Sequence, residues 1–537
     1  MELNVTLAAS SKTNSSNNTL ELTGWNPSDT NRGSIDILWS CCIIIILCCW
    51  VSTFPNITSL NDKWYHAFVD KFNLACIGFL GPDYLFAIAL GQLSSAMRSV
   101  RLFQDLSRVA HGRKWTLVHG FFADMGGFTL VSPDYPPFPV NAEQLHYLVK
   151  HGHVDFPSIT KPEIKALSKT DSLSKVIVLW QVLWFSASEL QRVRQGLPMT
   201  TFELTALSFS LTMLITSLCW YAKPTSSTSI MLHTNDGRSV QYIRAAARSS
   251  THPGLSSTWC RSPFDFISPH RRFRVDVHWS YYARLTYMVK VPFFSREIKT
   301  RLWDRLPSDA WLVVDRGLLA PAFLVIVGFS VSPLIAWNWH FPTDGERLAW
   351  RVCSIYHAAF SIALGVYYIY AALLEDKKAA KLANYPQSLP CTPKVQQPAA
   401  IGRPALDESR PSKICHDVEA GSAPPENADA KTKGVIPRLI TWLRSWRNIS
   451  PDRDPDMAIG LHATFPALIG TFLYIFCRIF FYVEDFAFAS LLSPPLALPR
   501  LSCCDSLVAP PNCNRSGGSL LEQGDIRYEI PGIRSKT

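Results

Sequence analysis

The apolar residues of this chain are gathered into long runs, and this clustering constrains the fold more than any other feature. Five runs come close to the ~20 apolar residues that a helix needs to cross ~30 Å of hydrocarbon. Each of them contains at most one charged residue. These runs are residues 36–54, 199–221, 317–339, 350–374 and 458–483.

Two weaker segments bring the predicted number of transmembrane helices to about seven. Residues 72–93 are interrupted by Gly81-Pro82-Asp83, and residues 173–190 contain Gln181 and Glu189. A single apolar segment could be a buried helix of a soluble core, but five strong segments together favour a membrane protein. Charged residues make up 18% of the chain, below the ~25% of a soluble protein. We therefore predict an all-α integral membrane protein.

Positive charge lies in three segments between the apolar runs. Residues 98–114 hold five basic residues against one acid, 223–316 hold fifteen against seven, and 375–456 hold thirteen against eleven. Lys and Arg flanking transmembrane helices mark the cytoplasmic side. This pattern predicts large basic cytoplasmic loops, with membrane hairpins at 173–221 and 317–374 that leave and return on the same side.

Two orientations of the N-terminus remain open at this point. If residues 72–93 cross the membrane fully, the N-terminal tail lies inside the cell. If they form a re-entrant hairpin that turns at Gly81-Pro82, the tail lies outside. The chain lacks the basic n-region and adjoining apolar stretch of a cleaved signal peptide, so residues 36–54 are predicted to act as a signal anchor.

Five predicted glycosylation sites bear on this choice. The first orientation places two of them, Asn56 and Asn514, outside and leaves the other three inside. The second places the whole tail outside. The predicted acceptors are Asn4, Asn14, Asn17, Asn56 and Asn514.

The remaining segments are predicted from composition. Residues 1–35 read as a disordered polar tail, 96–172 as an amphipathic cytoplasmic segment, 222–316 as a basic cytoplasmic loop and 375–456 as a disordered linker. The membrane spans occupy 36–95, 173–221, 317–374 and 457–484, and the C-terminal tail is 485–537. Within 96–172, Thr160 to Glu163 matches a capping box with proline in the first turn, which predicts a short helix.

The loop 222–316 mixes arginines with aromatic residues, as in RRFRVDVHWSYYARL. Such mixing occurs at single-stranded nucleic-acid sites and also at anionic membrane surfaces. Apolar spans on both sides favour membrane lipids as the partner and argue against nucleic acid.

The fourteen cysteines do not form a recognisable metal or disulfide pattern. Cys41, Cys42, Cys48 and Cys49 lie in the first span, with spacing unlike known metal sites. They read as small hydrophobic residues, so we expect no metal and no cofactor. A disulfide among Cys503, Cys504 and Cys513 in the tail is an open alternative.

Ionisable groups inside membrane spans are the first functional candidates. Gln181 and Glu189 are eight residues apart, so they share one broad helix face with Arg192. The alternatives are hydrogen bonding between helices and an i,i+3 ion pair between Glu189 and Arg192. Glu203 lies four residues into its span, near the interface.

The phrase HGFFADMGGF, residues 119–128, supplies two more candidates. His119 and Asp124 are five residues apart, which is ~140° around a helix, so a simple acid–base pair on one face is disfavoured. Gly126-Gly127 is expected to end the helix. We interpret the phrase as an interfacial or re-entrant element, and packing of satisfied polar groups is the alternative to a site.

Several motifs resemble those of a family of multi-pass membrane proteins from filamentous fungi, some of which resemble products of secondary-metabolite gene clusters. They are RGSIDILWSCC, VHGFFADMGGF, the run from SKTDSLSK to VLWQVLWF, RVRQGLPMTTFEL and CWYAKP. The resemblance extends to about residue 485, and the tail from residue 487 departs from it. It implies topology and origin, and no catalytic residue.

Two classes of function follow. One is a membrane-embedded cyclase or isomerase that acts on a lipophilic intermediate, with His119, Asp124, Gln181, Glu189 and Glu203 as catalytic candidates. Proton transfer in a dry pocket needs only one or two well-placed groups, so the missing nucleophile and phosphate motifs do not exclude it. The other is a non-enzymatic transporter, receptor-like protein or scaffold for pathway enzymes.

Overall fold

The computed structural model describes residues 34–106, 112–167, 172–196, 199–226, 228–267, 273–288, 296–383, 446–450, 454 and 457–491. The chain divides into two compact units, Met1–Ser493 and Pro494–Thr537, and every described residue belongs to the first. Most of the predicted disordered tail, linker and C-terminal tail lie outside the described residues, as do Asn4, Asn14, Asn17 and Asn514.

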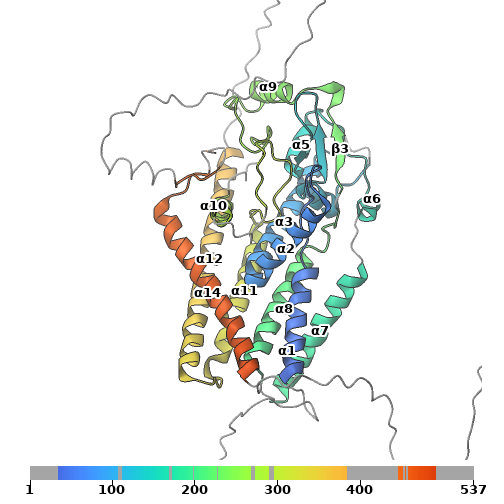
Figure 1. The fold of residues 1–537 in the computed structure, drawn as a ribbon. Helices are drawn as coiled ribbons and strands as arrows, with labels where there is room; N and C mark the ends of the chain where they lie inside the picture. The colour runs from blue at the N-terminus through green and yellow to red at the C-terminus, as the bar shows by residue number, and fades with distance from the viewer. Residues whose placement is uncertain are drawn as a thin grey trace, which may run out of the picture. The chain divides into compact units, whose positions relative to one another are not determined.

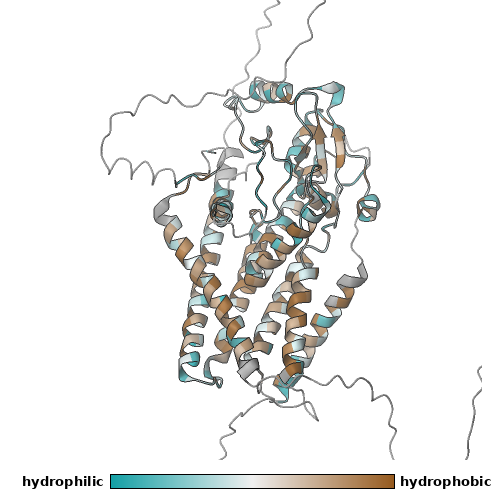
Figure 2. Cartoon of the chain, in the orientation of Figure 1, coloured by the Kyte–Doolittle hydropathy of each residue, from teal (hydrophilic) through white to brown (hydrophobic). Residues whose placement is uncertain are grey.

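Long helices form one half of the first unit (Figure 1). They are α1 (Ser34–Val51), α7 (Ser172–Arg194), α8 (Thr201–Cys219), α11 (Arg316–Val331), α12 (Asp344–Ala383) and α14 (Leu461–Leu491). Figure 2 shows that hydrophobic residues cover much of these helices. Large apolar side chains such as Leu324 and Phe472 are 70% or more exposed, as expected for surfaces that face lipid.

Four helices among the described residues are long and apolar enough to cross a membrane, fewer than the predicted seven. They are Thr201–Cys219, Arg316–Asn338, Asp344–Glu375 and Thr464–Ala487. The apolar part of α1, Ile35–Val51, is shorter than these spans. The segment 173–190 forms the helix α7, but its polar residues reduce its hydropathy.

The predicted span 72–93 is not one helix. The chain breaks at Gly81, between α2 (Trp64–Leu80) and α3 (Pro82–Gln104), and Pro82 occupies the first turn of α3. The two helices pack against each other as a hairpin. Its tip is fixed to α14, because Tyr482 Oη donates to Phe79 O over 2.8 Å and Tyr474 Oη donates to Asp83 Oδ1 over 2.7 Å.

A three-stranded sheet lies at the opposite end of the unit, so the fold is mostly helical rather than all-α. Strand β1 (Phe128–Val131) pairs antiparallel with β2 (Phe138–Val140) and parallel with β3 (Ile230–His233), in the order β2-β1-β3. The strands are only three or four residues long and rich in Phe, Val, Leu and Ile. Such short strands carry a weak periodic signal, which explains why the sheet was not predicted.

The other described helices are short. They are α4 (Leu117–Asp124), α5 (Ala142–Lys150), α6 (Lys161–Ala166), α9 (Val240–Ser250) and α10 (Arg274–Met288), together with the 3₁₀ turn η1 (Asn235–Gly237). A second 3₁₀ turn, η2 (Ser332–Asn338), follows α11 and packs against α8 and α12. The capping box predicted at the start of α6 is confirmed, since Thr160 N–H donates to Glu163 Oε2 over 2.8 Å.

The phrase HGFFADMGGF forms α4 and the start of β1. The helix ends at Asp124, and Gly126 adopts a φ of +86°, as the double glycine predicted. Phe121 and Phe122 are fully buried in the protein core. A Cβ atom on Gly127 would lie 2.4 Å from Phe122 O, so the turn into β1 requires glycine. The phrase therefore packs inside the protein, and the interpretation as an interfacial element is not supported.

Candidate functional site

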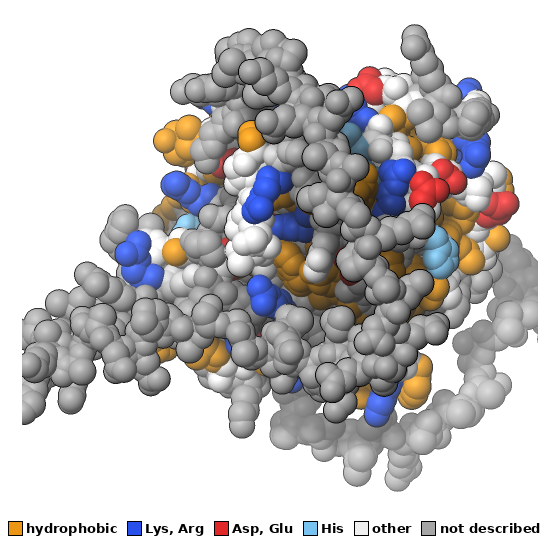
Figure 3. All heavy atoms as spheres, turned by 90° about the horizontal axis from the view of Figure 1, so that it is seen from above, with side chains coloured by type: hydrophobic (Ala, Val, Ile, Leu, Met, Phe, Trp, Pro, Cys, Tyr) orange, Lys and Arg blue, Asp and Glu red, His pale blue; other side chains and the backbone are white. Residues whose placement is uncertain are grey.

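A cavity of about 360 Å³ lies between α3, α4, α10 and the loop 296–312. Its aromatic walls include Phe121, Trp279, Tyr287, Trp303 and Trp311. Its polar groups include Asn56, Gln92, Arg98, Asp124, Lys223 and Asp276. Figure 3 views the molecule from above, where Lys and Arg side chains lie around hydrophobic ones. A largely apolar cavity with a few convergent polar groups is the usual form of a small-molecule site.

Lys223 is the most deeply buried cation in this cavity. It follows the end of α8 and is 2% exposed. Its ammonium Nζ donates to Phe54 O at 2.6 Å, Gln92 Oε1 at 2.9 Å and Asn56 Oδ1 at 3.0 Å. Burial lowers the pKa of Lys223 to about 7, and the charge of Asp124 counteracts this. Three acceptors match the three protons of the ammonium, so the geometry favours the charged form.

Asp124 is the last residue of α4 and lines the same cavity. Its Oδ1 accepts from the Ala142 N–H at 3.1 Å, at the first turn of α5, while its Oδ2 makes no hydrogen bond to the described residues. Burial raises the pKa of the Asp124 carboxyl to about 6, although the Ala142 N–H and the Ser95 side chain act in the opposite direction. A carboxyl with this pKa and one open oxygen can accept or donate a proton near neutral pH.

Two acidic residues, Asp276 and Asp309, line the cavity from α10 and the loop after it. Asp276 Oδ1 accepts from the Trp311 N–H at 2.9 Å, and its Oδ2 lies 4.0 Å from a guanidinium nitrogen of Arg261. Asp309 Oδ2 accepts from Trp279 Nε1 at 3.1 Å. Burial raises the pKa of Asp276, and the nearby charge of Asp309 acts in the same direction. Neither residue was among the sequence-predicted candidates.

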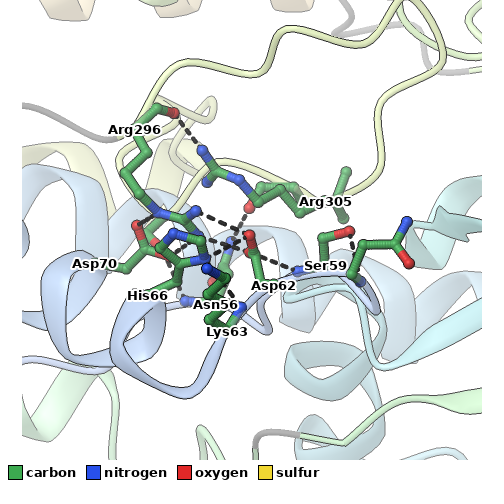
Figure 4. A network of polar contacts seen from close by, with 11 residues as sticks. Asn56, Ser59, Asp62, Lys63, His66, Asp70, Arg296 and Arg305 are labelled. Carbon is green, nitrogen blue, oxygen red and sulfur yellow. Dashed lines mark hydrogen bonds and ion pairs between the residues drawn. The ribbon is translucent and has the colours of Figure 1, made fainter.

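An ion-pair network ties the loop 296–312 to α2 (Figure 4). Arg296 binds Asp62 at 2.7 Å and Asp70 at 2.8 Å, and Arg305 donates to the carbonyl of Arg296. Burial alone would raise the pKa of Asp62, but the hydrogen bond and charge of Arg296 together lower it. Because Arg296 also lines the cavity, this network holds one wall of the cavity in place.

Asn56 belongs to this interior rather than to a glycosylated surface. It is 8% exposed, and its Nδ2 donates to Pro307 O at 2.9 Å. A glycan would replace one hydrogen of this buried amide and has no room there. The buried position of Asn56 therefore disfavours a glycan there in the folded protein, and the predicted site stays a prediction.

His119 lies apart from Asp124 and does not line the cavity. Its Nδ1 lies 2.7 Å from Thr116 Oγ1, at the start of α4, and its Nε2 lies 3.2 Å from Ile159 O. Burial lowers its pKa. Both ring nitrogens are occupied by structural contacts, so we assign His119 to the capping of α4.

The other three candidates lie on α7 and α8. Gln181 is exposed on α7. Glu189 and Glu203 are fully buried and share Arg192, whose nitrogens lie 3.8 Å and 3.4 Å from their carboxylates. Glu203 also accepts from Thr200 N–H at 2.9 Å, which caps α8. The ion pair expected between Glu189 and Arg192 is present, and this cluster joins α7 to α8 outside the cavity.

Comparison with known proteins places the first part of the chain in context. Residues 5–262 match the model of a family of unknown function (DUF8562). The match covers just under half of the 537 residues and includes Asn56, Asp124 and Lys223. No curated protein and no solved structure matches the chain. Among the residues that the structure describes, no group of three or more His, Cys, Asp and Glu side chains could hold a metal ion.

Proposed function

We propose that the helices of the first unit cross a membrane several times and that the cavity end faces the cytoplasm. The described parts of the basic segments 98–114 and 223–316 belong to this end, where positive charge favours the cytoplasmic side. Phe54, just after α1, contacts Lys223, just after α8, so both helices finish at the cavity end. The N-terminal tail then lies on the opposite side of the membrane, and the α2–α3 hairpin is re-entrant.

Within this arrangement, the protein is a membrane enzyme that moves a proton on a lipophilic small molecule. The observation that carries the proposal is Asp124, which lines an aromatic-walled cavity and whose Oδ2 makes no hydrogen bond within the described part of the chain. The resemblance to fungal membrane proteins supports a lipophilic secondary metabolite as the substrate class. Cyclisation and isomerisation are the reactions that need only such a transfer.

Asp124, Lys223 and the aromatic walls of the cavity have different roles in this reaction. Asp124 accepts a proton from the substrate or donates one to it, since its pKa of about 6 lies close to cytoplasmic pH. Lys223, in its ammonium form, supplies a positive charge that stabilises negative charge developing on a carbonyl or enol oxygen. The aromatic walls bind the apolar body of the substrate and exclude water.

The test is ligand capture followed by conversion. The full chain is purified in nanodiscs, exposed to an extract of fungal metabolites, and examined by native mass spectrometry for a bound small molecule. The bound compound is then incubated with wild type, Asp124→Asn and Asp236→Asn, the last being a control at an exposed carboxylate. We expect conversion by wild type and the control, and binding with at least ~100-fold slower conversion by Asp124→Asn.

Conversion by Asp124→Asn at the wild-type rate would remove Asp124 from the mechanism. Binding without conversion by any form would instead support a receptor-like or carrier function for the same cavity. Failure to bind any compound would count against the cavity as a ligand site.

A further inference from the structure

One face of α14 carries a row of polar residues into the interior of the helix bundle. Tyr474, Arg478, Tyr482 and Asp485 are spaced by four, four and three residues, so they lie on one side of the helix. All four are at most 6% exposed. They lie within the apolar span Thr464–Ala487. Ionisable residues inside a membrane span are costly and usually functional.

Arg478 is the only cation in this row. Its guanidinium donates to Tyr482 Oη at 2.9 Å and lies 4.9 Å from the centre of the Phe329 ring. Its Nε has no hydrogen-bond partner, and no carboxylate lies within 4.0 Å of the guanidinium, in the part of the chain that the structure describes. A buried guanidinium in this state needs compensating negative charge nearby.

Two buried carboxylates lie on either side of Arg478. Asp83, at the tip of the α2–α3 hairpin, is 4% exposed and accepts from Tyr474 Oη at 2.7 Å. Asp485 is 1% exposed and lies beside Thr201 and Thr205 of α8. Asp83 is bound by Tyr474, one helical turn before Arg478, and Asp485 lies two turns after Arg478 on the same face of α14, so the charge of Arg478 acts on both carboxylates.

Other titratable groups also lie around the row. His357 of α12 stacks on Tyr474 with ring centres 4.8 Å apart, and its Nδ1 lies 3.1 Å from Ser330 O. Tyr84 of α3 contacts the Tyr474 ring at 5.1 Å and is neutral. Glu484 interacts with Glu346, at the first turn of α12, and its negative charge also acts on Asp485.

The summed charge of Asp83, Arg478 and Asp485 indicates which ion this group can bind. With both carboxylates ionised, Asp83, Arg478 and Asp485 carry a net charge of −1, and with one of them protonated the group is neutral. A low-dielectric interior favours the neutral state. A metal cation would be repelled by Arg478, and an anion would be repelled by the carboxylates.

We propose that Asp83, Arg478 and Asp485 form an intramembrane proton-binding site that holds one exchangeable proton on one of its two carboxylates. This site is separate from the cavity and from the reaction proposed there. Protonation of Asp83 would change its hydrogen bond with Tyr474, which holds the hairpin tip against α14.

Infrared spectroscopy of the full chain in nanodiscs at pH 7 tests this proposal. A protonated buried carboxyl gives a carbonyl band that shifts in heavy water. We expect wild type to show this band and both Asp83→Asn and Asp485→Asn to lack it, because the remaining carboxylate then balances Arg478 without a proton. Asp344→Asn, at a carboxylate that is 93% exposed, is the matched control and keeps the band.

Arg478→Gln separates the proposal from a general loss of structure. Without the cation both carboxylates favour the protonated form, so the band grows about twofold. Circular dichroism checks that each variant keeps its helix content. A band that persists unchanged in Asp83→Asn or in Asp485→Asn, or that is absent from wild type, overturns the proposal.

Discussion

Lys223 donates a 3.0 Å hydrogen bond to Asn56 Oδ1 across 167 residues of sequence, and this contact joins the loop after α1 to the end of α8. Lys223 also reaches Phe54 O, while Asn56 Nδ2 reaches Pro307 O. The two side chains thereby connect three separate segments around the cavity. The stability of the cavity end should depend on them.

Replacement of Lys223 by Met should lower the free energy of unfolding by about 2 kcal/mol. Phe54 O and Asn56 Oδ1 would lose a buried donor, whereas Gln92 Oε1 would still accept from Trp220 Nε1. Thermal unfolding in detergent measures the effect, with the exposed Lys150→Met as the control. Equal melting temperatures for the two variants would show that the Lys223 contacts contribute little.

Asn56→Gln should leave the electrophoretic mobility of the protein unchanged after expression in a glycosylating host, because Asn56 is buried. The triple variant Asn4→Gln, Asn14→Gln and Asn17→Gln should instead lose a glycosidase-sensitive shift, since the proposed orientation places the tail outside. A glycosidase-sensitive band that depends on Asn56 alone would contradict both the burial and the orientation.

The stability of the protein should depend on pH through Asp124. The folded-state pKa of about 6 exceeds the ordinary value of 3.8, so folding disfavours the ionised form. The wild type therefore loses stability as the pH rises from 3.8 to about 6. Asp124→Asn avoids this loss and should be more stable than wild type by about 3 kcal/mol at pH 7.

That advantage should shrink as the pH falls back through 6 towards 3.8, where the carboxyl of the wild type becomes neutral. Melting curves of the two proteins at several pH values test the sign. An advantage for the variant that stays constant with pH would show that Asp124 is not the titrating group.

Gly127→Ala should destabilise the fold by about 1–3 kcal/mol. The new methyl group would lie 2.4 Å from Phe122 O, which is backbone and cannot move aside. Gly254→Ala is the control, because a methyl group there would have no atom within 4 Å. Chemical denaturation compares the two, and equal midpoints would mean that the α4–β1 turn adjusts freely.

Local patterns predicted part of this structure. The apolar runs predicted the four spans. Gly81-Pro82 predicted the break between α2 and α3, and Thr160 with Glu163 predicted the start of α6. These features depend on residues that are close in sequence. The parallel pairing of β1 with β3 depends on residues about a hundred positions apart, such as Phe128 and Ile230. Short strands carry no signal for such a partner.

The candidate site shows the same division. Asp124 was predicted as a candidate because it is a polar residue within an apolar segment. Lys223 lies at the end of an apolar run, in CWYAKP, and was not among the predicted candidates. A lysine that directly follows a span usually reads as an interfacial anchor. Only the three-dimensional arrangement brings Lys223, Asn56 and Asp124 to one cavity, whereas His119 turns out to serve the start of α4.

Solvent deuterium incorporation tests the central claim most directly. The compound captured by the cavity is incubated in heavy water with membranes that contain wild type or Asp124→Asn, and the product is examined by mass spectrometry. Proton transfer by Asp124 predicts that wild type introduces one deuterium and that the variant introduces none above the background of empty membranes. Equal deuterium incorporation by the two proteins would contradict the account.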